Sequence, residues 1–134
     1  MKKLFVIILT SISLISCTKK VSTPIGAANQ NIFFQDANVA VEDMVAVPTA
    51  ANTVTISFST AFENNISRIE LMSSASTNTF CTTQAVDITD NSSSKKDFSF
   101  SDSNVKGSTM YYMLRFKDNS GNWTYTPYVT VQVN

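Results

Sequence analysis

Hydrophobic and polar positions alternate along most of the chain, from about Asp36 to the C-terminus. The clearest stretch is residues 53–60, where Val54, Ile56 and Phe58 alternate with threonine and serine. A period of two places one face of a β-strand in a core and the other face in water. No window shows the apolar recurrence every 3.6 residues that an amphipathic helix requires. The pattern therefore predicts an all-β chain built from half-buried, antiparallel strands.

The same alternation predicts about seven strands in all. A first strand lies within residues 39–47 and is ended by Pro48, and the others are expected at residues 53–60, 66–72, 81–88, 97–101, 110–117 and 125–133. In the strand at 110–117, Tyr112, Leu114 and Phe116 share one face. Residues 118–122 have the sequence Asp-Asn-Ser-Gly-Asn, whose members tolerate positive φ and predict a hairpin turn.

Seven short strands in about 100 residues are typical of an immunoglobulin-like sandwich. Two segments resemble fibronectin type III-like modules of bacterial secreted and surface proteins. Residues 66–71 leading to Phe80 are similar to the C strand, and residues between 111 and 129 are similar to the F strand, the FG hairpin and the G strand. The resemblance covers roughly residues 50–134.

The resemblance implies a spacer, an adhesion unit or an accessory binding module, and fold alone does not choose among these. It also implies a structural role for Tyr112 as a tyrosine corner, with a buried ring and a hydroxyl bonded to the backbone. Ile56 and Phe58 stand where fibronectin type III domains usually carry a core tryptophan.

A targeting segment is expected at the N-terminus. Two lysines precede an apolar run at residues 4–15, whose 12 residues are too few to span a bilayer. The run ends in Leu-Ile-Ser-Cys at residues 14–17. This arrangement resembles the signal peptide and lipobox of a bacterial lipoprotein. The resemblance implies a diacylglycerol on the Cys17 thiol and removal of residues 1–16, so that the mature protein begins at Cys17.

Lipidation of Cys17 would hold the protein on a membrane nearly permanently, because two or three acyl chains give stable anchoring. Thr18 follows the cysteine, and the absence of an aspartate at this position favours the bacterial outer membrane. The domain would face either the periplasm or the cell surface. The alternatives are an ordinary secretory signal with a chance cysteine, or a buried N-terminal helix.

The chain is expected to divide into a signal peptide at residues 1–16, a lipidated N-terminus with a flexible tether at residues 17–35, and a β-sandwich domain at residues 36–134. Residues 18–31 contain proline, glycine and small residues. A coil of about 14 such residues reaches roughly 20 Å. Residues 32–34 are apolar enough to pair beside the first strand.

The chain has two cysteines. If lipid uses the sulfur of Cys17, Cys81 has no partner within the chain, and we expect no internal disulfide. Cys81 is then expected to be a small buried hydrophobic residue. Alternatively, its thiol would link to a partner in an oxidising compartment.

Composition excludes several classes of function. The chain has no histidine, which removes Ser-His-Asp and Cys-His catalysis and the commonest zinc ligand. Without residues 1–16 it has eight basic and ten acidic residues, a formal net charge of −2. It also lacks the basic stripe that binds nucleic acid. We therefore expect a protein that is not an enzyme, needs no cofactor and does not bind nucleic acid.

The acidic residues do not predict a metal site. Asp87 with Asp90, or Asp102 with Asn104, would be the ligands of a calcium site, but isolated acids in such polar loops are expected to form solvated turns. The run at residues 118–122 is similar to the start of an EF-hand loop, but a tryptophan follows where the sharp turn requires glycine. Nothing in the spacing of the acidic residues fixes a carboxylate pair across a sugar either.

A candidate binding site remains in the aromatic residues Trp123, Tyr125 and Tyr128, which follow the last turn. Exposed aromatic rings stack on sugars or anchor protein partners. Alternatively the rings cap the core, because Trp123 and Tyr125 share parity with Val129. Two functions follow from these observations. One is a membrane-anchored lipoprotein that contacts another envelope or surface protein, and the other is a glycan-binding or adhesion module that uses these aromatic residues.

Overall fold

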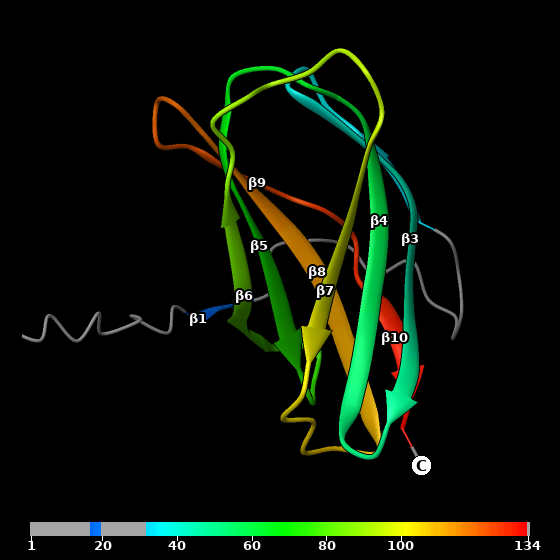
Figure 1. Ribbon diagram of the computed structural model, residues 1–134. Coiled ribbons are helices and arrows are strands. Elements are labelled where there is room, and N and C mark those ends of the chain that lie inside the picture. Colours follow the sequence, from blue (N-terminus) through cyan, green and yellow to red (C-terminus); the bar gives the residue numbers. More distant parts are fainter. Residues whose placement is uncertain (1–16, 20–31, 134) are drawn as a thin grey trace, which may run out of the picture.

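The computed structural model describes residues 17–19 and 32–133 and shows an all-β sandwich of two antiparallel sheets (Figure 1). The predicted fold class of an antiparallel, two-sheet β-sandwich is therefore confirmed. The proposed signal peptide and most of the proposed tether lie outside the described residues. Within the described ranges, no helix is long and apolar enough to cross a membrane.

The larger sheet, called sheet A, has the strand order β1-β6-β5-β8-β10, and β9 also pairs with β8. Its strands are β1 (Cys17–Lys19), β5 (Ile66–Ser74), β6 (Thr79–Asp87), β8 (Thr109–Asp118), β9 (Trp123–Tyr125) and β10 (Val129–Gln132). The smaller sheet, called sheet B, has the order β2-β3-β4-β7. Its strands are β2 (Ile32–Gln35), β3 (Val39–Ala50), β4 (Thr53–Glu63) and β7 (Lys96–Asp102).

All seven predicted strands are present with shifted bounds, but the described residues form ten strands rather than about seven, because β1 and β2 precede them and one predicted strand is divided in two. The strand expected at residues 125–133 is divided into β9 and β10, because the chain leaves the ladder between Tyr125 and Val129. The first strand does not end at Pro48, since β3 continues to Ala50. A proline lacks an N–H and is tolerated where a strand has no partner on one side. The last residue of β3 that pairs with β2 is Met44. At Pro48, β3 therefore pairs only with β4 and has no partner strand on its other side.

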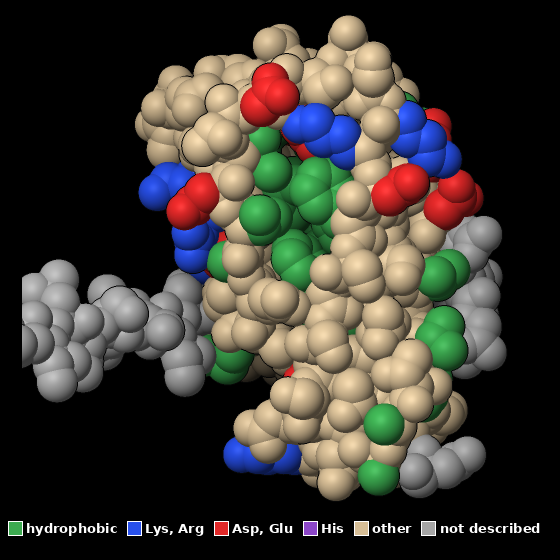
Figure 2. All heavy atoms as spheres, viewed as in Figure 1, with side chains coloured by type: hydrophobic (Ala, Val, Ile, Leu, Met, Phe, Trp, Pro, Cys, Tyr) green, Lys and Arg blue, Asp and Glu red, His purple; other side chains and the backbone are tan. Residues whose placement is uncertain are grey.

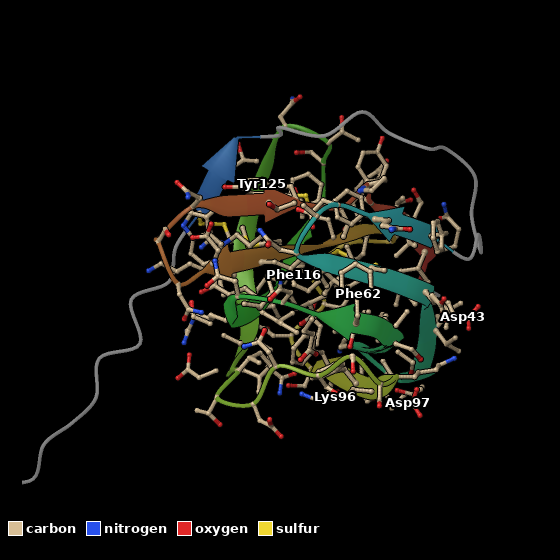
Figure 3. The ribbon with its side chains drawn as sticks, turned by 90° about the horizontal axis from the view of Figure 1, so that it is seen from above. Asp43, Phe62, Lys96, Asp97, Phe116 and Tyr125 are labelled. Carbon is tan, nitrogen blue, oxygen red and sulfur yellow. A yellow bond between two sulfur atoms is a disulfide. The ribbon has the colours of Figure 1, made fainter. Side chains whose placement is uncertain are left out.

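The main core lies between the sheets and confirms the predicted alternation. Tyr112, Leu114 and Phe116 of β8 are buried against Ile56 and Phe58 of β4 in this cluster. In the view from above, the charged residues labelled on the side of sheet B lie away from Tyr125, which belongs to sheet A (Figure 3). Hydrophobic side chains also reach the surface between β6 and β7, with charged side chains around them (Figure 2).

A second apolar cluster covers the outer face of sheet A. It consists of the buried residues Met72, Phe80, Met113 and Tyr128, with Tyr111 and Tyr125 packed against them. Since side chains alternate along a strand, Met113, which lies between Tyr112 and Leu114, points away from the main core. Sheet A therefore carries buried apolar side chains on both faces.

Residues 32–34 pair beside the first predicted strand, as expected, because β2 pairs with β3, so regular structure begins before the domain boundary expected at residue 36. Ahead of these residues, β1 pairs antiparallel with β6 and places Cys17 opposite Cys81. The structure joins these two cysteines in a disulfide. The expectation of no internal disulfide is wrong for this structure, because it assumed that the Cys17 sulfur was used by lipid. Cys81 is half-buried rather than buried.

Candidate functional site

The three aromatic residues singled out in the sequence lie together on the outer face of sheet A. Trp123 pairs with Lys117 and Tyr125 pairs with Arg115, and both partners point away from the main core. Val129 faces the main core instead, because the break between β9 and β10 changes the alternation. Trp123 and Tyr125 therefore do not cap the core between the sheets, although the parity that they share with Val129 predicted that they would; Tyr125 packs instead against the second apolar cluster, which includes Tyr128.

Their exposure differs. Trp123 and Tyr125 are half-buried, whereas Tyr128 is only 6% exposed. The Tyr128 ring lies between Phe80, at a centroid distance of 6.0 Å, and Tyr111, at 5.3 Å with its ring edge-on. Burial first, and Tyr111 second, raise the pKa of the Tyr128 hydroxyl. Tyr128 is thus part of the packing that holds this face in shape, and Trp123 and Tyr125 are the members open to a partner.

The Trp123 ring is held by two cations of β8. The guanidinium carbon of Arg115 lies 4.1 Å from the ring centroid, and the Lys117 ammonium lies 5.5 Å from it. Both distances are within the range of cation–π attraction. The pairing of β8 with β9 across the turn at Asp118 produces this arrangement.

That turn has the predicted hairpin structure. The Asp118 carboxylate accepts hydrogen bonds from the backbone N–H of Ser120 at 2.8 Å and of Asn122 at 2.9 Å, and from the Asn122 amide at 3.0 Å. Gly121 supplies the positive φ of 91° that closes the turn. The Asn122 side chain, together with these backbone donors, lowers the pKa of the Asp118 carboxyl. Its oxygen atoms thus shape the hairpin that presents Trp123.

Below the aromatic residues lies a charged cluster that the sequence did not predict. The Arg115 guanidinium donates to Glu70 at 2.7 Å, and Thr82 donates to the same carboxylate at 2.9 Å. Arg68 donates to the other oxygen of Glu70 at 2.7 Å. Glu70 is 5% exposed and Arg115 is 4% exposed. Alternation in the strand predicted at residues 66–72 puts Arg68 and Glu70 on the face opposite to Ile69 and Leu71, which would be the face in water. Only the register of β5 against β8 shows that Glu70 stands opposite Arg115.

The pKa of the Glu70 carboxyl reflects this setting. Burial alone raises it, but the hydrogen bonds from Arg68, Arg115 and Thr82 act in the opposite direction and together prevail, so that the pKa lies below its usual value. Glu70 is therefore held ionised, and it fixes the Arg115 side chain beneath the Trp123 ring. The cluster positions the aromatic face.

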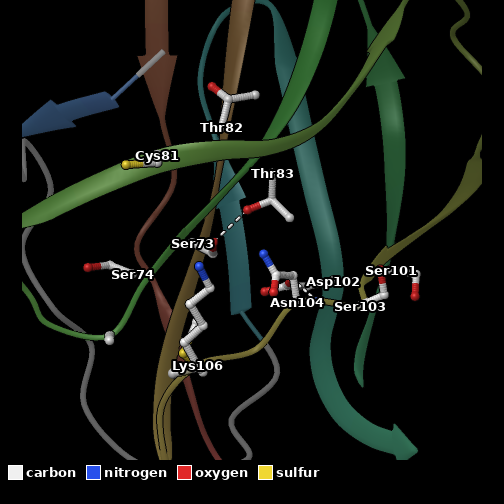
Figure 4. Close-up of a pocket in the computed structure, with 12 residues that line it drawn as sticks. Ser73, Ser74, Cys81, Thr82, Thr83, Ser101, Asp102, Ser103, Asn104 and Lys106 are labelled. Atoms are coloured by element: carbon white, nitrogen blue, oxygen red, sulfur yellow. Dashed lines mark hydrogen bonds between the residues drawn. The ribbon is translucent and has the colours of Figure 1, made fainter. Parts of the chain in front are cut away.

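A separate pocket of about 570 Å³ opens between the β5–β6 turn and the β7–β8 loop (Figure 4). Its lining is rich in hydroxyl groups, and it also contains Asp102, Asn104 and Lys106. Asp102 and Asn104 were expected to form a solvated turn rather than a calcium site, but Asp102 is buried. The described residues contain no group of three or more histidine, cysteine or acidic side chains suited to a metal ion. Nothing in the sequence pattern shows that two separate turns share a cavity.

Tyr112 connects this pocket to the core. Its ring is fully buried, as the fibronectin type III resemblance implies. Its hydroxyl, however, donates to the Asp102 carboxylate at 2.9 Å rather than to the backbone. Burial first, and this bond second, raise the pKa of the Tyr112 hydroxyl. The other carboxylate oxygen of Asp102 accepts the Asn104 N–H at 3.1 Å.

Comparison with known proteins adds no relative to this description, because no protein-family model, curated protein or solved structure matches the chain.

Proposed function

We propose that this protein is a membrane-anchored, non-enzymatic lipoprotein of the bacterial outer membrane, and that its fibronectin type III-like domain contacts another envelope or surface protein. Two features of the sequence support this proposal. The N-terminal residues resemble a lipoprotein signal peptide that ends at Cys17, and the absence of histidine removes the commonest catalytic arrangements.

The observation that carries the protein-interaction role is the outer face of sheet A. Trp123 and Tyr125 are half-exposed there; Trp123 pairs with Lys117, which in turn pairs with Arg68 of β5. Tryptophan, tyrosine and arginine dominate the binding energy of protein interfaces. Arg115 holds the Trp123 ring in place from below, so little side-chain freedom remains to be lost when a partner binds.

Lipidation and the disulfide are alternative uses of one atom. The sulfur of Cys17 forms either a thioether with a diacylglycerol or a bond with Cys81, as in the structure. The proposed function requires the thioether in the membrane-bound protein, which leaves the Cys81 thiol free to react.

The intact mass of protein extracted from its native membrane distinguishes the two states. The proposal predicts the mass of a chain that begins at Cys17 and carries acyl chains, and a single thiol that alkylates without prior reduction. A mass without lipid, together with two thiols that alkylate only after reduction, would contradict the anchor.

Photo-crosslinking tests the partner face. A photoreactive phenylalanine analogue is placed at Tyr125 in the full-length protein in its native membrane. The matched control is the same analogue at Phe33, an aromatic residue of sheet B that is 62% exposed. We expect a stoichiometric adduct with one envelope or surface protein from position 125 and none from position 33. Equal adducts from both positions, or none from either, would remove the proposed interface.

A glycan-binding or adhesion role is the second candidate, and the half-exposed ring of Trp123 is the observation that favours it. The Arg115 guanidinium packs against one face of that ring, 4.1 Å from its centroid, so this face is not available to a sugar. Loss of glycan retention by a folded Trp123→Ala variant, with no protein adduct from position 125, would favour this second role.

A further inference from the structure

The pocket between the β5–β6 turn and the β7–β8 loop has the dimensions of a ligand site. Its volume of about 570 Å³ falls within the range of roughly 300–1,000 Å³ that is usual for small-molecule sites. It is lined by residues of sheet A, by the end of β7 of sheet B and by the loop that follows β7. The outer face of sheet A described above is a different surface.

The lining offers many groups that exchange hydrogen bonds. Ser73 of β5 and Thr83 of β6 lie with their hydroxyl oxygens 2.5 Å apart at one side of the pocket (Figure 4). A hydroxyl both donates and accepts, and an asparagine amide such as that of Asn104 does the same. A ligand with several hydroxyl groups of its own is the natural complement of such a lining.

The charge of the lining selects among polyhydroxylated ligands. Lys106 is the cation of the lining, and no ion pair joins it to any of the described carboxylates. Asp102 is the acid of the lining, and Tyr112 and Asn104 already donate to its two oxygens. Both Asp102 oxygens are therefore already occupied by neutral donors, and Lys106 is the charged group of the lining that remains available to pair with a ligand.

The loop that carries Lys106 is held on both sides. Val105 is buried in the main core, and its N–H donates to the Asn52 carbonyl at 3.2 Å. On the other side, a Cβ atom on Gly107 would lie 3.2 Å from the Thr109 carbonyl oxygen and 3.4 Å from the Ala75 side chain. Gly107 thus allows this loop to approach the β5–β6 turn closely, and Lys106 lies between Val105 and Gly107, which are both held in place.

We propose that this pocket binds a saccharide residue that bears a carboxylate, a uronic acid. The carboxylate pairs with the Lys106 ammonium, and the ring hydroxyls exchange hydrogen bonds with Ser73, Thr83 and Asn104. Recognition rests on charge and hydroxyl groups, because the lining contains no aromatic ring on which the sugar could stack. The proposed contacts do not include the aromatic face or Cys81, although Cys81, whose bond to Cys17 the lipid anchor would remove, also lines the pocket.

Titration of the isotopically labelled, detergent-solubilised full-length protein with D-glucuronate tests this site by NMR. D-glucose is the matched neutral sugar and inorganic phosphate the matched anion without a sugar ring. We expect saturable shifts at the amides of Thr83 and Lys106 with D-glucuronate. We also expect an affinity for D-glucuronate at least about tenfold higher than for either comparison ligand. D-glucose lacks the carboxylate that forms a charge-assisted hydrogen bond, and phosphate lacks the ring hydroxyls that form the remaining hydrogen bonds.

Two lysine variants localise the effect. Lys106→Gln is expected to reduce the affinity for D-glucuronate about tenfold, the loss of one ion-paired hydrogen bond. Lys95→Gln is the control, since Lys95 is an exposed lysine that lies 3.8 Å from Glu42 and Asp43, away from the pocket. Equal loss in both variants, equal binding of all three ligands, or no saturable shift in the folded wild-type protein would overturn the proposal.

Discussion

Glu70 and Arg115 form the charged contact on which the aromatic face depends. Both are almost fully buried, and their closest approach is 2.6 Å. A buried ion pair contributes little to stability compared with apolar residues of the same size, but removing one partner leaves a charge that is poorly compensated. The pair therefore matters more for the position of Trp123 than for the total stability of the domain.

Replacing Arg115 tests this distinction. We expect Arg115→Met to lower the free energy of unfolding by about 3 kcal/mol, because Glu70 then remains buried with only part of its hydrogen bonding. Urea denaturation followed by tryptophan fluorescence measures the change. In the double variant Glu70→Leu, Arg115→Met, most of that loss is expected to be regained, since no charge is left in the site. If Arg115→Met is as stable as the wild-type protein, Glu70 and Arg115 are hydrated and do not form a buried ion pair.

The lowered pKa of Glu70 also predicts a dependence of stability on pH. The unfolded chain protonates this carboxyl near the ordinary value of 4.5, and the folded protein does so at lower pH. The unfolded state thus binds more protons in that window, so the contribution of Glu70 is complete above pH 4.5 and is lost as the pH falls through the folded pKa. Glu70→Gln should flatten the acid limb of the stability curve.

The control for this pH experiment is Glu42→Gln. Glu42 is half-exposed and lies 3.8 Å from Lys95, so its replacement should leave the acid limb as it is in the wild-type protein. Thermal melts between pH 3 and pH 7 provide the comparison. The interpretation of Glu70 fails if both variants change the acid limb equally.

The break between β9 and β10 decides which face the aromatic residues occupy. Thr126 is fully buried, and its hydroxyl accepts the Leu114 N–H at 3.0 Å while it donates to the Pro127 carbonyl at 2.8 Å. The Thr126 N–H donates to the Leu114 carbonyl at 2.9 Å, and the Thr126 hydroxyl takes the place of a backbone carbonyl as the acceptor of the Leu114 N–H. This substitution of side chain for backbone lets the last strand change its alternation.

Removing that hydroxyl should therefore destabilise the last strand. Thr126→Val keeps the volume but leaves the buried N–H of Leu114 without its acceptor, and we expect a loss of about 1–3 kcal/mol. Thr124→Val in β9 is the control, because Thr124 is half-exposed and valine suits a strand equally well. Denaturant unfolding of both variants provides the test, and equal stabilities would show that the Thr126 hydroxyl does not hold the break.

Strands were predictable from the sequence because alternation is a local property, as Val54, Ile56 and Phe58 of β4 show. Contacts between strands were not. Glu70 and Arg115 are 45 residues apart, and their meeting depends on the register of two strands that no local pattern fixes. The change of alternation at Thr126 was missed for a related reason, since it depends on a hydrogen bond to β8.

At the scale of the whole molecule, residues 17–19 and 32–133 form two candidate surfaces that one side chain connects. The aromatic face lies on the outside of sheet A, and the hydroxyl-rich pocket lies between the ends of the two sheets. Thr82 lines the pocket and donates to Glu70 beneath the aromatic face. An occupant of the pocket that takes the Thr82 hydroxyl would compete for that bond, so the two surfaces are connected by a single side chain.

The state of Cys17 determines how this whole molecule is held together. In the structure, the disulfide to Cys81 closes a loop with a sequence separation of 64 residues. A loop of that length stabilises the folded state by about 4 kcal/mol, on the model in which the bond restricts the unfolded chain. A thioether at Cys17 would prevent the disulfide, so its contribution to the free energy of unfolding would be lost. The lipid would instead attach the protein to the membrane.

Reductant and a Cys81→Ser variant therefore separate the two states in one experiment. For the lipidated protein that we propose, neither dithiothreitol nor Cys81→Ser should change the denaturation midpoint in detergent by more than the error, while Cys17→Ser should release the protein from the membrane fraction. For a disulfide-bonded protein, dithiothreitol and Cys81→Ser should each lower the free energy of unfolding by about 4 kcal/mol. In that case Cys17→Ser should lower it equally and leave the distribution between membrane and soluble fractions unchanged. Because the two sets of outcomes share no result, the experiment decides which bond the Cys17 sulfur forms.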